Sequence, residues 1–139
     1  MSSSMSRSER EWVAQGASEA DVLSRLYDVW TYKEALTKNM GLGLGYDFAR
    51  IDLRFGRDVR LAMDGRAVDT YRFRELALPC GASSRAPGSR VAIALGPCDA
   101  WEAPMSKQAV PAQQAMDEGW LRMWTYDAWL DYARAMSGV

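Results

Sequence analysis

The chain has 139 residues, of which 48% are hydrophobic, and its 17 basic and 18 acidic residues leave a formal net charge of −1. This length is enough for one well-buried core and too short for two full domains. A sequence pI near 5.5 disfavours nucleic acid as the main partner, because proteins that bind phosphate backbones carry a basic face or a high pI. The chain has no histidine, which excludes Ser-His-Asp and Cys-His catalysis and every histidine-containing zinc site.

The first residues, 1–7, are polar and rich in serine, and we expect a disordered tail there, followed by a single domain over residues 8–139. This start has no apolar stretch of the kind that secretory signals need. The longest apolar run, Val91 to Leu95, is far too short to cross a membrane. The sequence therefore predicts a cytoplasmic protein without membrane contact, whose Cys80 and Cys98 are reduced thiols.

Two helix starts precede the first glycine-rich segment. Ser8 and Glu11 have the spacing of a capping box, and Ser18 with Asp21 forms a weaker version of the same pattern. The second helix has apolar residues at helical spacing as far as Leu36, and we expect it to stop within Gly41–Gly45. N-terminal helices are therefore predicted.

After the glycines the apolar period changes from 3.6 to 2. Residues 50–55 alternate between apolar and charged, and Val59, Leu61 and Met63 repeat the apolar alternation. Asp64-Gly65 is a strong hairpin signal, and a third strand ends at 71–74. A fourth strand is expected at 91–95, between loops at 76–90 and 96–111. These patterns predict a four-stranded, mainly antiparallel sheet.

From Ala112 the pattern is helical again, with a weak point at Gly119 and a strong segment from Trp120 to Met136. The predicted fold class is thus α+β, with N-terminal helices, a four-stranded sheet and a C-terminal Trp-rich helix packed on the sheet. That last helix is apolar on nearly every side, and a domain of this size offers little further protein to bury a second helix face. We therefore expect a partner protein to cover that face. The predicted partner-binding residues on it are Met123, Tyr126, Trp129 and Leu130.

The strands also carry an arginine-rich face, whose candidate partner-binding residues are Arg54, Arg72 and Arg74. Such a face with aromatic neighbours can bind single-stranded nucleic acid. However, six acidic residues interleave with seven arginines over 46–75, which favours cross-strand pairing or a protein partner.

No motif in the sequence predicts catalysis. The run Gly41, Gly43, Gly45 follows a helix and precedes a strand, whereas a phosphate-binding glycine loop needs the opposite order. Asp127 and Asp131 share a helix face, but Arg134 is placed to neutralise one of them. No catalytic, cofactor-binding or metal-binding residue and no cofactor is predicted.

These observations favour a small, non-enzymatic protein-binding module, an inhibitor or adaptor of the kind that phages and mobile elements encode, which occupies a partner protein's surface. One alternative is a self-assembling structural protein, such as a homodimer, with the C-terminal helix as its homomeric interface. The others are a small enzyme, a small-molecule binder, or a single-stranded nucleic-acid binder that uses the arginine-rich face.

Overall fold

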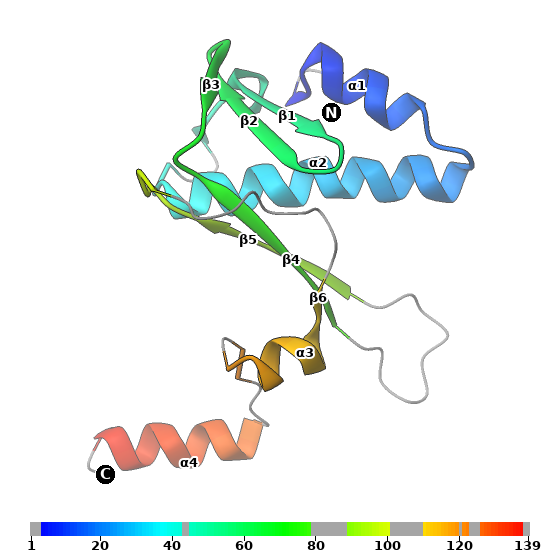
Figure 1. The fold of residues 1–139 in the computed structure, drawn as a ribbon. Coiled ribbons are helices and arrows are strands. Elements are labelled where there is room, and N and C mark those ends of the chain that lie inside the picture. The colour runs from blue at the N-terminus through cyan, green and yellow to red at the C-terminus, as the bar shows by residue number, and fades with distance from the viewer. Residues whose placement is uncertain are drawn as a thin grey trace.

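The computed structural model describes residues 4–42, 45–78, 89–100, 110–119, 121–122 and 126–137. Two helices, a first antiparallel sheet, a second sheet and two further helices follow one another along the chain (Figure 1). The α+β class, with N-terminal helices, antiparallel strands and a C-terminal helix, is confirmed.

Helix α1 (Arg7–Ala14) begins two residues before the predicted start. Its capping box is formed by Ser6 and Glu9, instead of Ser8 and Glu11. The Ser6 hydroxyl accepts from the amide of Glu9, and the Glu9 carboxylate accepts from the amide of Ser6 at 2.7 Å. The serine-rich start offered two overlapping capping patterns, and contacts elsewhere in the fold decide between them.

Helix α2 (Glu19–Asn39) has the predicted limits. Ser18 caps its first turn by accepting from the amide of Asp21. Beyond its last turn Gly41 has φ +70°, the left-handed conformation that ends many helices at a glycine.

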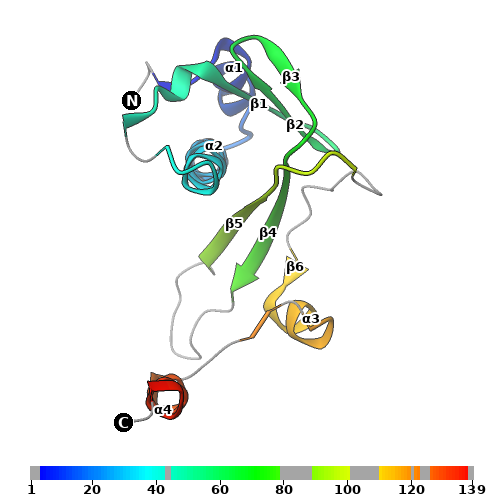
Figure 2. The ribbon, with the colours of Figure 1, turned by 90° about the vertical axis from the view of Figure 1, so that its left-hand side faces the viewer.

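The first sheet has the order β1-β2-β3, formed by β1 (Ile51–Phe55), β2 (Val59–Met63) and β3 (Arg66–Val68). Asp64 and Gly65 both have positive φ, as the predicted two-residue hairpin turn requires. Figure 2 shows α2, seen end-on, beside the face of this sheet. The core is formed between them by buried residues of both elements: Tyr32, Leu36, Ile51, Leu53 and Leu61.

The structure has two sheets, whereas the sequence predicts a single four-stranded sheet. The second has the order β5-β4-β6, formed by β4 (Arg72–Leu78), β5 (Ser89–Leu95) and the short β6 (Val110–Pro111). The predicted third strand divides because Val68 pairs with Leu61 in the first sheet, whereas Arg72 pairs with Leu95 in the second.

The C-terminal helix does not cover the apolar face of the first sheet, because α2 already occupies that face. The expected helical region comprises α3 (Ala112–Asp117) and α4 (Tyr126–Ser137), with Gly119 at φ +79° after α3. Helix α4 stands apart from both sheets in Figures 1 and 2. Of its predicted interface residues, Met123 lies outside the described residues.

Within the described residues, no helix has both the length and the apolar character needed to cross a membrane.

The core position of Leu36 gives a first prediction. Leu36 is fully buried between α2 and the first sheet, whereas Leu23 on the same helix is half exposed. Leu36→Ala should lower the free energy of unfolding by about 2–5 kcal/mol through the cavity that it leaves. Leu23→Ala, the matched control, should have a much smaller effect. Urea unfolding of both variants checks this, and equal losses would contradict the assigned core.

Candidate active site

A carboxylate with no solvent exposure, that of Glu9, joins three segments of the chain. Its Oε1 accepts from the amide of Leu53 on β1 at 2.8 Å. Its Oε2 accepts from the amide of Ser6 and from Nζ of Lys33, each at 2.7 Å. Since β1 is an edge strand of its sheet, Glu9 satisfies a backbone donor that no neighbouring strand reaches.

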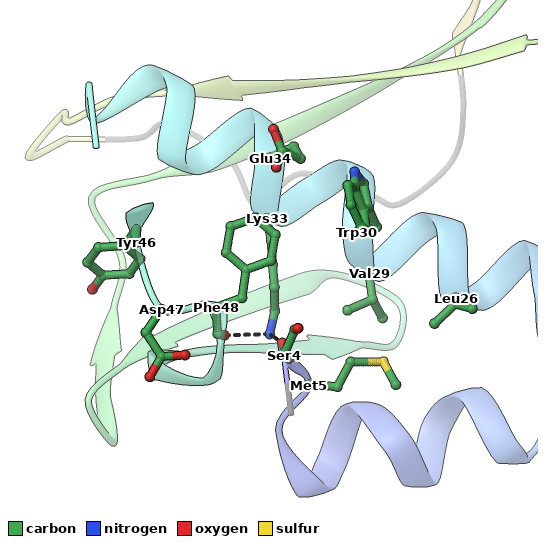
Figure 3. A pocket seen from close by; sticks show the side chains of 10 residues that line it. All are labelled: Ser4, Met5, Leu26, Val29, Trp30, Lys33, Glu34, Tyr46, Asp47 and Phe48. Carbon is green, nitrogen blue, oxygen red and sulfur yellow. Dashed lines mark hydrogen bonds between the residues drawn. The ribbon is translucent and has the colours of Figure 1, made fainter. Parts of the chain in front are cut away.

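The ammonium of Lys33, whose side chain is only 1% exposed, lies across from Glu9. Besides the ion pair, Nζ donates to the carbonyl of Ser4 at 3.0 Å and to that of Phe48 at 2.8 Å (Figure 3 draws the bond to Phe48). An ammonium has three protons, so its donor capacity is filled. Burial lowers the pKa of Lys33, although the hydrogen bond and charge of Glu9 oppose that shift.

A pocket of about 280 Å³ opens beside this ion pair. Figure 3 shows α2 along one side, the segment around Phe48 opposite, and the start of the chain between them. Trp30 and Phe48 meet edge to face, with 6.4 Å between their ring centroids. The lining residues are Ser4, Met5, Leu26, Val29, Trp30, Lys33, Glu34, Tyr46, Asp47 and Phe48.

Two carboxylates besides Glu9 belong to this site. Glu34 follows Lys33 on α2; its side chain is 15% exposed, and its Oε2 lies 3.6 Å from Nζ of the exposed Lys38. Asp47 caps the short 3-10 helix η3 (Phe48–Arg50), with Oδ1 accepting from the amide of Ala49 at 2.9 Å. The pocket therefore combines apolar and aromatic walls with anionic groups from two elements.

The segment that holds Asp47 is anchored from the side away from α2. The guanidinium of Arg50 makes two hydrogen bonds to Asp64 in the β2–β3 turn, at 2.7 and 2.6 Å, and lies 5.2 Å from the ring centroid of Tyr46. The hydrogen bond and charge of Arg50 lower the pKa of Asp64. The pocket wall is thus tied to the first sheet.

A second polar cluster holds the start of α1. The Asp52 carboxylate on β1 accepts from the hydroxyls of Ser6, at 2.6 Å, and Ser8. Partial burial acts to raise the pKa of Asp52, but these hydrogen bonds, together with the neighbouring Arg54, outweigh it and lower the pKa. Ser6 lies in the stretch that was expected to be disordered, and Ser8 follows directly after it. Both serines make specific contacts with β1.

The aromatic residues predicted as partner-binding lie far from the pocket along the chain. Tyr126 and Trp129 of α4 are 73% and 52% exposed, and their rings stack with centroids 6.5 Å apart. Leu130, on the same helix, is half buried. Of the two cysteines, Cys98 is a free, exposed thiol, and Cys80 lies outside the described residues.

The arginines predicted as one face are divided between the two sheets. Arg54 lies on β1 in the first sheet, and Arg72 and Arg74 lie on β4 in the second. Arg72 donates to the carbonyls of Asp69 and Tyr71, so its guanidinium serves the turn before β4.

The residues of the pocket are not among the site residues predicted from the sequence, although a signal for them exists. Val29, Lys33 and Leu36 share the inner face of α2, so a lysine interrupts an apolar stripe. Glu9 likewise lies one turn before the buried Val13 on α1. A charged residue on an apolar helix face is seldom buried without a partner, and two such residues of opposite sign predict a buried pair.

Among the described residues, no group of three or more cysteine, aspartate or glutamate side chains could hold a metal ion. The site is thus a pocket with apolar and aromatic walls, to which Glu34 and Asp47 add carboxylates. The buried ion pair of Glu9 and Lys33 lies beside it. Such a concave site with a few polar groups is typical of an enzyme or small-molecule binder.

Comparison with known proteins identifies the family. The model of the 4'-phosphopantetheinyl transferase superfamily matches residues 1–93, and the chain belongs to that superfamily. It is also similar to the 4'-phosphopantetheinyl transferase pptA of Paxillus involutus, with 40% identity over 67 residues. The alignment covers 48% of this chain and 25% of that relative, so the chain spans much less than the relative's whole length.

These findings correct the functional prediction. The interpretation as a non-enzymatic binding module, an inhibitor or a viral protein is wrong, because the family and the relative indicate a transferase enzyme. The absence of histidine excludes histidine-dependent catalysis, but it does not exclude catalysis in general. Transfer of phosphate-linked groups relies mainly on positioning and electrostatic stabilisation, which other residues can supply.

The buried ion pair gives the second prediction. Glu9→Gln leaves the Lys33 ammonium buried without its counter-charge and should lower the free energy of unfolding by about 3–5 kcal/mol. Lys33→Met should be similarly damaging. The double variant should lose clearly less than the sum of the two, because it leaves no unpaired buried charge.

The exposed pair of Arg7 and Glu11 on the same helix is the matched control for this cycle. Its double-mutant cycle, measured by urea unfolding, should give a coupling below about 1 kcal/mol. Strict additivity of the Glu9 and Lys33 variants would show that their charges do not stabilise each other.

Proposed function

We propose that this chain takes part in transferring 4'-phosphopantetheine to a carrier protein, and that the pocket between α2 and η3 receives the phosphopantetheinyl donor. The observation that carries the proposal is that the family match covers every residue of the pocket. Coenzyme A is the donor that we consider, because it holds 4'-phosphopantetheine through a pyrophosphate bond to a nucleotide.

In the proposed reaction, a hydroxyl oxygen of the carrier forms a new bond to the pantetheine-bearing phosphorus. The pyrophosphate P–O bond breaks, the nucleotide leaves with the second phosphate, and the hydroxyl proton passes to a base. Glu34 and Asp47 are the pocket residues able to accept that proton. Because charge is spread over phosphate oxygens in such a transfer, positioning and electrostatic stabilisation supply most of the catalysis.

Glu34 would supply one carboxylate to Mg²⁺, an ion bound in phosphate-transfer sites through one or two carboxylates together with water and substrate phosphates. When bound, Mg²⁺ would neutralise part of the phosphate charge. Lys38, which is 75% exposed and one turn beyond Glu34 on α2, is a cation next to that carboxylate. Lys33 has a different role, because its three protons already have acceptors.

The walls of the pocket suit the uncharged part of such a donor. Leu26, Val29, Trp30 and Phe48 provide apolar and aromatic contact, and the two rings support each other edge to face. A half-exposed tryptophan at the mouth can pack against a ligand with little loss of side-chain entropy.

The third prediction tests this function. Coenzyme A should bind the chain, as measured by isothermal titration calorimetry. Glu34→Gln should lower phosphopantetheinyl transfer to an apo-acyl carrier protein, followed by mass spectrometry of the carrier, at least ~100-fold, the usual loss on removing an electrostatic group from a catalytic site.

Glu19→Gln is the control for this variant, since Glu19 is an exposed glutamate in the first turn of the same helix. It should leave binding and transfer unchanged. The absence of coenzyme A binding to the unmodified chain, or equal transfer by both variants, would contradict the proposal.

The exposed aromatic face of α4, defined by Tyr126 and Trp129, is proposed separately as a protein-binding surface, which its large exposed area supports. It lies outside residues 1–93, so this role does not depend on the family. The fourth prediction is that Trp129→Ala leaves the fold intact by circular dichroism. It should cost about 2 kcal/mol of association with a second copy of the chain, a typical hot-spot value. Unchanged self-association in analytical ultracentrifugation would exclude this role for α4.

A further inference from the structure

A groove lies between α2 and β5, on a different side of α2 from the pocket that holds Trp30 and Phe48. Its volume is about 620 Å³, and it shares no lining residue with that pocket. The wall formed by α2 runs from Ala20 to Thr31, a length of about 16 Å that an extended chain covers in about five residues. In Figure 2, β5 is the strand of the second sheet next to α2.

The other wall is an edge of the second sheet. In the part of the chain that the structure describes, β5 pairs with β4 and has no strand on its other side. Pro111 of β6, opposite Ala77, has no N–H to donate, so the ladder between β4 and β6 must use the backbone groups of Glu75 and Ala77. Their cross-strand partners on β5 are Ala92 and Arg90. Because hydrogen-bonding direction alternates along a strand, the backbone groups of these two partners point away from β4 and toward the groove.

Side chains on both sides of Ala92 hold β5 at a fixed distance from α2. On one side, the guanidinium of Arg90 lies 3.2 Å from the carboxylate of Asp28 on α2 and 3.3 Å from that of Glu75 on β4. On the other, Nδ2 of Asn39 donates to the carbonyl of Ala94 at 3.2 Å, which agrees with the outward direction of alternate residues on β5. A groove held in this way does not have to form on binding, which lowers the entropic cost of occupying it.

The lining of the groove determines which side chains an occupant needs. Leu23 and Tyr27 on α2 are 50% and 61% exposed and offer apolar contact. The charged lining residues are two buried carboxylates, Asp28 and Glu75, and one guanidinium, Arg90, so negative charge is in excess. A lysine side chain suits this combination, because its alkyl stem can cover apolar surface while its ammonium contacts the tyrosine ring or the carboxylates.

We propose that an extended, basic segment of a partner protein adds to β5 as an antiparallel strand and fills this groove. Outward-facing N–H and C=O groups at a sheet edge bind extended chains, with affinity from the main chain and specificity from the side chains. Ala92 packs toward the core and Arg90 contacts α2, so residues opposite them in an added strand direct their side chains toward α2 as well. This site is independent of the proposed transferase function, since the groove and the donor pocket share no lining residue.

The fifth prediction uses fluorescein-labelled peptides of about eight residues in which lysine and threonine alternate, with binding measured by fluorescence anisotropy. In the antiparallel arrangement, lysines that face α2 also direct their N–H groups to β5. N-methylation of every lysine removes these donors and should weaken binding at least ~10-fold, because several hydrogen bonds are lost. N-methylation of every threonine is the matched control and should change the affinity little, since those N–H groups lie on the outer edge.

Variants of the chain test the lining of the groove. Leu23→Ala should weaken binding of the unmethylated peptide about 5-fold, because part of the leucine side chain is buried only in the complex. Leu42→Ala is the control, since Leu42 is 41% exposed and lies outside the groove, and it should bind the peptide normally. A peptide with glutamate in place of lysine should bind more weakly than the lysine peptide at low ionic strength, and salt should reduce the difference.

Three results would overturn strand addition at β5. The first is the absence of saturable binding of the unmethylated peptide up to about 1 mM. The second is equal or reversed affinity of the two methylated peptides, which would show that the main chain of the peptide does not pair with β5. The third is self-association of the chain that Leu23→Ala abolishes, without peptide binding, which would assign the groove to a second copy. Coenzyme A binding by the same variants should stay unchanged, so failure of this site and failure of the donor pocket are distinguishable.

Discussion

The burial of one ammonium group constrains the structure around the pocket. An ion without solvent costs several kcal/mol unless charge and hydrogen bonds replace its water. Lys33 finds those replacements in Ser4, Glu9 and Phe48, which belong to the chain start, α1 and the segment before β1. The three segments must therefore converge on one side of α2. Their convergence forms the pocket, since its floor and one wall are the partners of this lysine.

Adjacent residues on α2 consequently serve different purposes. Lys33 points into the protein and holds its surroundings together, while Glu34 lies at the pocket rim beside Lys38. Functional groups need support that fixes their position to a fraction of an ångström, and helices provide it better than loops. The opposite wall is a short 3-10 segment, which would be less rigid without the bonds from Arg50 to Asp64. The superfamily match covers all of these residues.

Charge is distributed differently inside and outside the protein. Inside, the buried carboxylates of Glu9 and Glu75 have polar partners, as a low-dielectric interior requires. Glu9 pairs with Lys33, and Glu75 contacts the Tyr32 hydroxyl and Arg90. Outside, Arg54 and Arg60 face each other across the first sheet although the register opposes like charges. Water and salt make such a surface tolerable.

The sequence by itself determined the local elements, because their signals are local. Ser18 begins α2, Gly41 ends it, and Asp64-Gly65 turns the hairpin, each through backbone preferences of a few neighbouring residues. Tertiary structure decided which of two capping patterns α1 uses, how the strands divide into two sheets, and that α2 covers the first sheet. It also decided the site, because Lys33 contacts Glu9, 24 residues away in the sequence, and Phe48, 15 residues away. Periodicity reports which side of a helix is apolar, but the partner of a buried charge is fixed only when distant segments meet.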